Sequence, residues 1–397
     1  MLPNDSNLTY CGHGTDTYST TQLVVRVYLL IPVVLFGFVA GVVNIVVFGS
    51  ASMRCSLINW YLMALSISDC LLLLCSFCMF SFPATVEHTH SFTLLEVATY
   101  TMRSLYPIGT TVQALNVYMT LLVSVHRYLG VCHPFKAQRW LTKKQLKLSV
   151  TGIFLFSVLF NLTRNLEITL RPCRSEMSNG TSVMMERTAL LASRTYFLLY
   201  SVICYSCFMF VLPFAALICI NTCIMRTIYQ SKRKRKRMTS MRKQRHGQSQ
   251  ERKELSTTVM LLAVVALFLL CNSLPFVNNI VDIVVQIHYE GQVSAAFRSN
   301  FTVLVEVGNL MVAVNSASSI IVYAAFGSKY RSVLCRIMRM ATDYSDISTA
   351  GDPMNSGMTL GERYSLRVNS YSYQGTSASP RSSLATPNTE KSAMVSL

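Results

Sequence analysis

Charged residues are scarce in this chain. Asp, Glu, Lys and Arg make up 13% of its 397 residues, whereas hydrophobic residues make up 51%. A soluble globular protein usually carries about twice that charged fraction. Because the apolar residues also come in long blocks, the composition argues against a soluble domain and favours a membrane protein.

Acidic residues are the scarcer of the two charges. The chain has 18 Asp and Glu against 35 Lys and Arg, which gives a formal net charge of +17. A basic excess of this size can indicate a nucleic-acid-binding protein. Here, however, most Lys and Arg lie in a few short segments between apolar blocks, as on the cytoplasmic side of a membrane protein. Nucleic acid is therefore not an expected partner.

Three further absences narrow the class of protein. The first residues, "MLPNDSNLTYCGHG", have no basic n-region and no apolar h-region, so we expect no cleaved signal peptide. No internal repeat is evident, which argues against a transporter built from duplicated halves. No His-Glu-x-x-His motif occurs, and Asp69 has no second aspartate at its depth in the membrane. An intramembrane enzyme is therefore not expected.

Seven apolar blocks are each long enough to cross the roughly 30 Å hydrocarbon core as a helix. We number them span 1 to span 7 in chain order, at about 24–50, 57–82, 98–131, 148–169, 195–225, 257–287 and 301–326. The expected fold is an all-α bundle of seven transmembrane helices over residues 24–326. Lys and Arg concentrate after spans 1, 3 and 5, above all in "KRKRKR" (232–237). The positive-inside rule then predicts an extracellular N-terminal segment, 1–23, and a cytoplasmic C-terminus, and we expect a multi-pass protein of the plasma membrane.

Two segments follow the last span. Residues 327–340, "GSKYRSVLCRIMRM", form a short basic amphipathic stretch that is expected to lie as a helix on the inner membrane surface, in contact with lipid. Cys335 within it is either a palmitoylation site or one more apolar residue. Residues 341–397 are rich in Ser, Thr, Gly and Pro, which predicts a disordered cytoplasmic tail.

Candidate glycosylation and disulfide sites lie on the predicted extracellular side. Asn4, Asn7 and Asn179 each begin an Asn-x-Ser/Thr triplet, the acceptor sequence for glycosylation. Of the thirteen cysteines, only Cys11 and Cys173 lie in polar stretches. Both are predicted to face the oxidising compartment, so a disulfide between them is one candidate pairing.

Polar residues inside the spans are costly and therefore suggest function. Asp69 in span 2 is expected to meet amides and hydroxyls at a similar depth on spans 1, 3 and 7, namely Asn44, Asn116, Asn315 and Ser319. One carboxylate among neutral oxygen donors suits a sodium ion or a proton; the alternative is plain hydrogen bonding between helices. Pro213 and Pro275 interrupt the hydrogen bonds of spans 5 and 6 and predict hinges.

The joint pattern resembles rhodopsin-like (class A) G-protein-coupled receptors. It combines seven spans with Asn44, "LSISD" (65–69), "HRY" (126–128), Pro213, Pro275, and Tyr323 before a basic amphipathic helix. Within that family, four stretches are similar to invertebrate FMRFamide-type neuropeptide receptors: "YLGVCHPF" (128–135), "LFNLTRNLE" (159–167), "FLLCNSLPFVNN" (268–279) and "NSASSIIVYAAFGSKYR" (315–331).

The resemblance implies roles for single residues. Arg127, between His126 and Tyr128 at the cytoplasmic end of span 3, would contact a heterotrimeric G protein, and arrestin would be a second intracellular partner. The alternative for Arg127 is that it only ends span 3 on the cytoplasmic side of the membrane. Tyr323 would move inward on activation. Asp69 would bind sodium, the one expected ion, and no other cofactor is expected.

The sequence also departs from the family pattern. His126 stands where the family usually has an acid, Ser273 where it has a tryptophan, and Ser319-Ile320 where it has Asn-Pro. Met102 replaces the usual cysteine at the outer end of span 3, which leaves Cys11 as the simplest partner for Cys173. A neutral imidazole restrains Arg127 less than an acid does, and a protonated one repels it. The hypothesis is a weaker inactive-state lock and some ligand-independent signalling.

The same comparison with the family narrows the chemical class of the ligand. Gly109 stands where amine receptors have an aspartate, and span 7 has no lysine for a retinal Schiff base. Glu96, Glu167, Asp282 and Glu306 lie at the outer ends of their spans and could bind the guanidinium of an amidated peptide ending in Arg-Phe. Alternatively, these acids only solvate helix ends. A chemoreceptor for a small molecule and an ion-coupled transporter using Asp69 remain the other functional alternatives.

Overall fold

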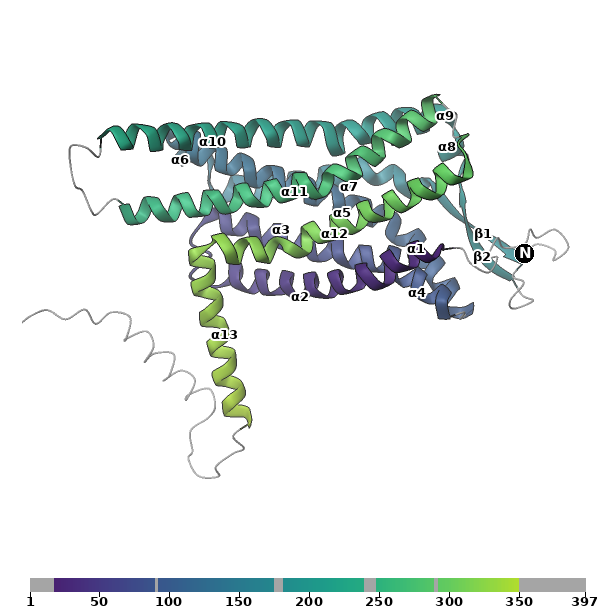
Figure 1. The fold of residues 1–397 in the computed structure, drawn as a ribbon, viewed down its shortest axis with the longest axis horizontal. Coiled ribbons are helices and arrows are strands. Elements are labelled where there is room, and N and C mark those ends of the chain that lie inside the picture. Colours follow the sequence, from purple (N-terminus) through teal and green to yellow (C-terminus); the bar gives the residue numbers. More distant parts are fainter. Residues whose placement is uncertain (1–17, 90–91, 175–180, 239–247, 289–291, 350–397) are drawn as a thin grey trace, which may run out of the picture. The chain divides into compact units, whose positions relative to one another are not determined.

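Seven long helices lie side by side in a bundle (Figure 1). The computed structural model describes residues 18–89, 92–174, 181–238, 248–288 and 292–349. The chain falls into two units, Met1–Met338 and Arg339–Leu397, and the bundle belongs to the first. Within the described residues, seven helices are long and apolar enough to cross a membrane. The predicted all-α seven-helix fold is confirmed.

Spans 1 to 4 are helical, and spans 1, 2 and 4 contain more than one helical element. Their elements are α1 (Thr20–Leu23), η2 (Val24–Leu29) and α2 (Leu30–Gly49) in span 1; α3 (Leu57–Ser76), η3 (Phe77–Ser81) and α4 (Phe82–Thr89) in span 2; α5 (Phe92–Cys132) in span 3; and α7 (Lys143–Asn161) with the 3₁₀ turn η4 (Leu162–Leu166) in span 4. A short helix, α6 (Pro134–Trp140), connects spans 3 and 4.

Spans 5 to 7 follow a β-hairpin. Their elements are α9 (Arg194–Tyr196), η5 (Phe197–Cys204), η6 (Cys207–Val211) and α10 (Leu212–Met238) in span 5, α11 (Gln248–His288) in span 6, and α12 (Ala295–Phe326) in span 7. The antiparallel hairpin consists of β1 (Ile168–Arg174) and β2 (Thr181–Arg187), with Ile168 opposite Arg187. The short helix α8 (Ala189–Ala192) leads from it into span 5.

Widened, π-helical turns precede three prolines of the bundle. The turns η2, η3 and η6 end shortly before Pro32, Pro83 and Pro213. The N–H after each turn bonds the carbonyl five residues back, from Leu30 to Val25, Phe82 to Phe77 and Leu212 to Cys207. Because a proline ring clashes with the carbonyl four residues before it, a wider turn gives the ring room. In span 6, Pro275 lies inside the continuous helix α11.

Two predicted boundaries are wrong. Span 4 was expected to run to residue 169, but its last helical turn ends at Leu166 and Ile168 begins β1. Apolar residues continue past the helix, and hydropathy alone does not separate a short strand from a helix end. The disordered tail was expected from residue 341, but α13 runs over Ser328–Thr349. No Gly or Pro interrupts the helix before Gly351 and Pro353. Residues 350–397 lie outside the described part of the chain.

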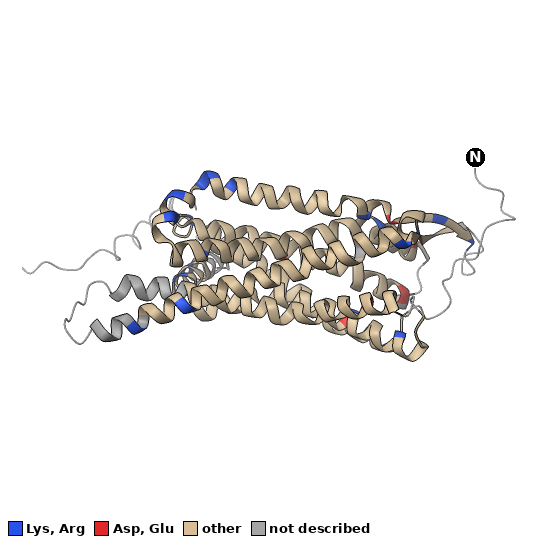
Figure 2. Ribbon diagram, turned by 90° about the horizontal axis from the view of Figure 1, so that it is seen from above, with Lys and Arg blue, Asp and Glu red and all other residues tan. Residues whose placement is uncertain are grey.

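The charged residues of the bundle lie toward its ends, with Asp and Glu toward the end near the N-terminus (Figure 2). Figure 2 shows Lys and Arg toward both ends of the helices and an almost uncharged middle. We call the end that carries β1 and β2 the hairpin end, and the opposite end, with α6 and the start of α13, the basic end (Figure 1). Large apolar side chains such as Leu35, Val39 and Leu159 are more than 60% exposed on the outside of the bundle. A membrane protein presents such residues to lipid.

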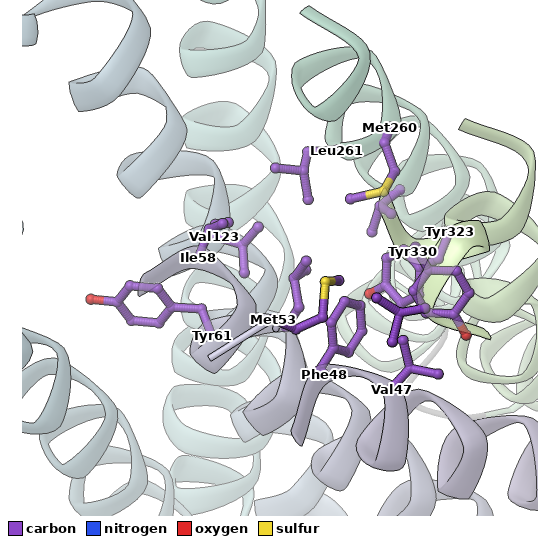
Figure 3. Packing of buried hydrophobic residues seen from close by; sticks show 13 residues of the cluster. Val47, Phe48, Met53, Ile58, Tyr61, Val123, Met260, Leu261, Tyr323 and Tyr330 are labelled. Atoms are coloured by element: carbon purple, nitrogen blue, oxygen red, sulfur yellow. The ribbon is translucent and has the colours of Figure 1, made fainter. Parts of the chain in front are cut away.

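The largest apolar cluster lies toward the basic end and joins spans 1, 2, 3, 6 and 7 to α13. Figure 3 shows Phe48 of span 1 beside Tyr323 of span 7 and Tyr330 of α13. The Phe48 ring centroid lies 5.2 Å from that of Tyr323 and 5.5 Å from that of Tyr330. Both tyrosines are buried. The first turn of α13 is thereby fixed against spans 1 and 7.

Candidate functional site

Asp69 lies in a buried polar core between spans 2, 3 and 7. Its side chain is 4% exposed. Asn116 Nδ2 donates a 2.6 Å hydrogen bond to Asp69 Oδ1 and a 3.3 Å bond to Ser68 Oγ. A cavity of about 10 Å³ is lined by Asp69, Asn116, Asn315 and Ser319, together with Thr120 and apolar residues. Four of the five residues predicted for this core thus meet around one space, which is about as large as one water molecule requires.

Asn44, the fifth predicted residue, does not line that cavity. Its Nδ2 donates to Ser319 Oγ at 3.3 Å, and its Oδ1 accepts from the Tyr330 hydroxyl at 2.6 Å. Tyr330 is not among the residues predicted for this core. A signal was present, because Tyr330, Val333, Leu334 and Ile337 recur at helical spacing and are the residues of α13 that pack on the bundle.

The oxygen atoms around the cavity are suitable ligands for a small hard cation. A carboxylate, an amide and a hydroxyl group from Asp69, Asn315 and Ser319 supply the oxygen ligands that sodium-like ions prefer. Within the described residues, no group of three or more His, Cys, Asp or Glu side chains could hold a metal ion. A transition-metal centre therefore has no support in that part of the chain.

The residues predicted to couple to a G protein lie at the basic end. Arg127 and Tyr128 are half-buried near the end of α5, and the Tyr128 hydroxyl lies 3.2 Å from His133 Nε2. The His126 ring meets the Tyr61 ring edge to face, with centroids 5.1 Å apart. Both His126 ring nitrogens are buried and have no hydrogen-bond partner among the described residues.

Tyr323 is sealed inside the apolar cluster of the basic end. It is 0% exposed, and its hydroxyl has no hydrogen-bond partner in the described part of the chain. A buried hydroxyl without a partner costs about 1–3 kcal/mol relative to one that is paired. The side chain therefore gains if a rearrangement brings it to a partner or to water.

Span 6 is closely packed at its proline. Gly308 of span 7 faces it, and a Cβ added there would lie 3.6 Å from Pro275 Cγ. Asn278 Nδ2 also donates to the Leu304 carbonyl of span 7 at 2.9 Å. Spans 6 and 7 are thus joined on the hairpin side of Pro275.

Two of the four predicted outer acids pair with arginines of the same chain. Glu167 is fully buried and accepts from Arg164 Nη1 at 3.0 Å, Tyr106 at 2.8 Å and Tyr196 at 2.9 Å. Glu306 of span 7 is paired with Arg26 of span 1. Neither arginine is among the predicted site residues, although each lies in or at the edge of an apolar span, where an unpaired cation is costly.

Glu96 and Asp282 are the other two predicted acids. Glu96 is half-buried in α5. Asp282, near the end of α11, lines a cavity of about 440 Å³ at the hairpin end, together with Arg187, Arg194 and Phe197. An acid, two cations and an aromatic ring thus face one space that is large enough for part of a peptide.

The remaining predicted sites are only partly described. Cys173 in β1 is buried and disulfide-bonded, while its predicted partner, Cys11, lies outside the described residues. The candidate glycosylation residues Asn4, Asn7 and Asn179 also lie outside them. Cys335 is an exposed free thiol on α13.

A family model for the "7 transmembrane receptor (rhodopsin family)" matches residues 40–323. The chain belongs to this receptor family. Members of the family are receptors, so the chain is a multi-pass membrane receptor and not an enzyme, as predicted.

Several curated proteins resemble this receptor over most of its length. It is 28% identical to the FMRFamide receptor of Drosophila melanogaster over 78% of the chain, but it spans only 54% of that protein's length. It is 26% identical to an FMRFamide peptide receptor of Caenorhabditis elegans over 78% of the chain and 68% of that protein. The somatostatin receptor type 5 of Bos taurus is 24% identical over 83% of the chain and 81% of that protein.

Proposed function

We propose that this receptor recognises an extracellular neuropeptide, an amidated FMRFamide-like peptide, and signals through heterotrimeric G proteins. The observation that carries the proposal is the similarity to FMRFamide receptors of two organisms, each over 78% of the chain. The family match supports the signalling mode. The hairpin end would face outward and the basic end inward, in the plasma membrane.

The cavity beside Asp282 supports peptide binding at the hairpin end. Its volume of about 440 Å³ suits one or two side chains of a peptide. Asp282 offers a carboxylate to a ligand guanidinium, and Phe197 offers an apolar surface to an aromatic ring. Because Asp282 lines this cavity, we assign the guanidinium contact to Asp282 before the other predicted acids.

The residues at the basic end support coupling of the receptor to a G protein. Arg127, with His126 and Tyr128, would meet the G protein, and Tyr323 would leave its apolar cluster when the basic end opens. Arrestin would use the same end. The amphipathic helix α13 would rest on the inner leaflet, with Cys335 available for palmitoylation.

The polar core supports a bound sodium ion in the inactive state. Asp69, Asn315 and Ser319 would hold it, and the small cavity between spans 2, 3, 6 and 7 leaves room for one such ion. An ion at this place stabilises the closed bundle, because its ligands come from more than one span.

One screen tests the proposed function. The receptor is expressed with promiscuous Gα subunits and exposed to a library of amidated peptides and, in parallel, to a library of metabolites and nucleotides. We expect responses to peptides that end in Arg-Phe-amide. A response to a small molecule together with none to any peptide would show instead a chemoreceptor on the same fold.

A further inference from the structure

Two arginine–glutamate pairs are buried in the half of the bundle nearer the hairpin. Arg26 pairs with Glu306 between spans 1 and 7, and their side chains are 12% and 5% exposed. Arg164 pairs with Glu167 at the end of span 4, and their side chains are 8% and 0% exposed. Each pair is neutral as a whole, as a buried site requires.

The two arginines use their N–H groups differently. Arg26 donates from Nε to Glu306 Oε2 at 3.0 Å and from Nη2 to Oε1. The Nε group and one terminal nitrogen of its guanidinium are therefore both hydrogen-bonded to the carboxylate. Arg164 reaches Glu167 and the Tyr106 hydroxyl with Nη1 alone. Its Nε is buried and has no partner among the described residues. The buried Nε of Arg164 therefore has no acceptor among the described residues, whereas the Nε of Arg26 donates to Glu306.

A buried acceptor without a partner among the described residues lies three residues before that donor in the chain. Asn161 is 1% exposed, and its Oδ1 is also without a partner in the described part of the chain. It is the last residue of α7, directly before η4, and precedes Arg164 by three residues. Side chains three residues apart on a helix are neighbours. The Tyr200 and Tyr205 rings flank the guanidinium, with their centroids 5.3 and 4.9 Å from Arg164 Cζ.

A primary carboxamide matches this arrangement. Its oxygen accepts from an N–H such as Arg164 Nε, its NH₂ donates to an oxygen such as Asn161 Oδ1, and its planar group suits a site walled by aromatic rings. A carboxylate matches poorly, because it has no proton to donate to Asn161. It would also add a negative charge to a site whose cation Glu167 already neutralises.

We propose that Arg164 and Asn161 bind the C-terminal carboxamide of the peptide, and that Glu167 sets the preference for the amide over the free acid. This inference rests on the proposed function. It assigns to Glu167 a role in ligand selectivity without direct contact with the ligand guanidinium.

The test compares the peptide Phe-Met-Arg-Phe-amide with the same peptide ending in a free acid. The measured quantity is the ratio of the two half-maximal concentrations within one variant, which does not depend on the level of surface expression. Glu167→Gln leaves the Arg164 charge without its counter-charge, so the free acid should gain and the preference for the amide should fall about tenfold or more. The inference is wrong if this variant keeps the wild-type ratio.

Glu306→Gln is the matched control, since it exposes the charge of Arg26 in the same way at a different place. It should keep the wild-type ratio, and an equal fall in both variants would overturn the assignment to Arg164. Asn161→Ala is an independent variant that serves if Glu167→Gln does not reach the cell surface. It should weaken the amidated peptide about tenfold and leave the free acid nearly unchanged, while an equal effect on both peptides would contradict the subsite.

The failure of this inference differs from the failure of the proposed function. A wild-type receptor that answers neither peptide contradicts the proposed function and, with it, the subsite. A wild-type receptor that answers the amidated peptide, with variants that all retain its selectivity ratio, contradicts the subsite alone.

Discussion

The Tyr330 hydroxyl donates a 2.6 Å hydrogen bond to Asn44 Oδ1, which joins α13 to span 1. Burial raises the pKa of Tyr330 above its usual value, so the hydroxyl keeps its proton at physiological pH. The bond connects the helix after the last span to the same Asn44 side chain that also meets Ser319 of span 7. It therefore couples three parts of the basic end.

Tyr330→Phe should destabilise the purified receptor by about 1–3 kcal/mol, because it leaves a buried acceptor unpaired without opening a cavity. The measurement is the melting temperature in detergent, which should fall. Tyr229→Phe is the control, since Tyr229 is 69% exposed on α10 and its change should have little effect. Equal melting temperatures for the two variants would show that the bond does not contribute.

Asp69→Asn tests the proposed sodium site. At equal salt concentration, wild-type receptor should melt at a higher temperature in sodium chloride than in potassium chloride, because an ion that binds only the folded state stabilises it. The difference should vanish in Asp69→Asn. Asp282→Asn removes the same charge at the hairpin end and should keep the sodium effect. A sodium effect that survives in Asp69→Asn would place the ion elsewhere.

His126→Asp should lower ligand-independent signalling. A carboxylate beside Arg127 can pair with it and hold the closed state, whereas the buried His126 ring carries no negative charge. A pair worth about 1 kcal/mol shifts the active fraction roughly fivefold. Basal second-messenger production at matched surface expression measures it, with His133→Asp as a control for an added charge at the basic end. Unchanged basal activity in His126→Asp removes the hypothesis of a weakened lock.

Much of the fold follows from the sequence, because each span must satisfy its backbone inside the membrane and can do so only as a helix. The polar core was also predictable, since Asp69 cannot lie in lipid without partners and Asn116 and Ser319 stand at its depth. The arginine partners of Glu167 and Glu306 were not predicted from the sequence. Arg26 reaches Glu306 from another span, so that pairing depends on how the helices pack. Arg164 lies only three residues before Glu167, but the spacing alone does not show that this arginine, rather than a ligand, pairs with the acid.

The span boundaries show a related limit. Ile168 is apolar and continues the run of span 4, yet it pairs with Arg187 in a strand. The choice between helix and strand there depends on a hairpin partner about twenty residues away, which no local pattern contains. Tyr330 was partly predictable. Its helical spacing with Val333 and Ile337 indicates a buried face of α13, but it does not show that the hydroxyl bonds Asn44.

In the proposed mechanism, an amidated peptide bound at the hairpin end activates a G protein through Arg127 at the basic end. The most direct test measures nucleotide exchange on a heterotrimeric G protein reconstituted with purified receptor, with and without Phe-Met-Arg-Phe-amide. Exchange should rise saturably with peptide for wild type and for Arg139→Ala, whose side chain is exposed on α6. Arg127→Ala should reach the surface and bind peptide but give no rise. The proposed mechanism is wrong if the peptide has no effect on wild type, or if Arg127→Ala gives full exchange.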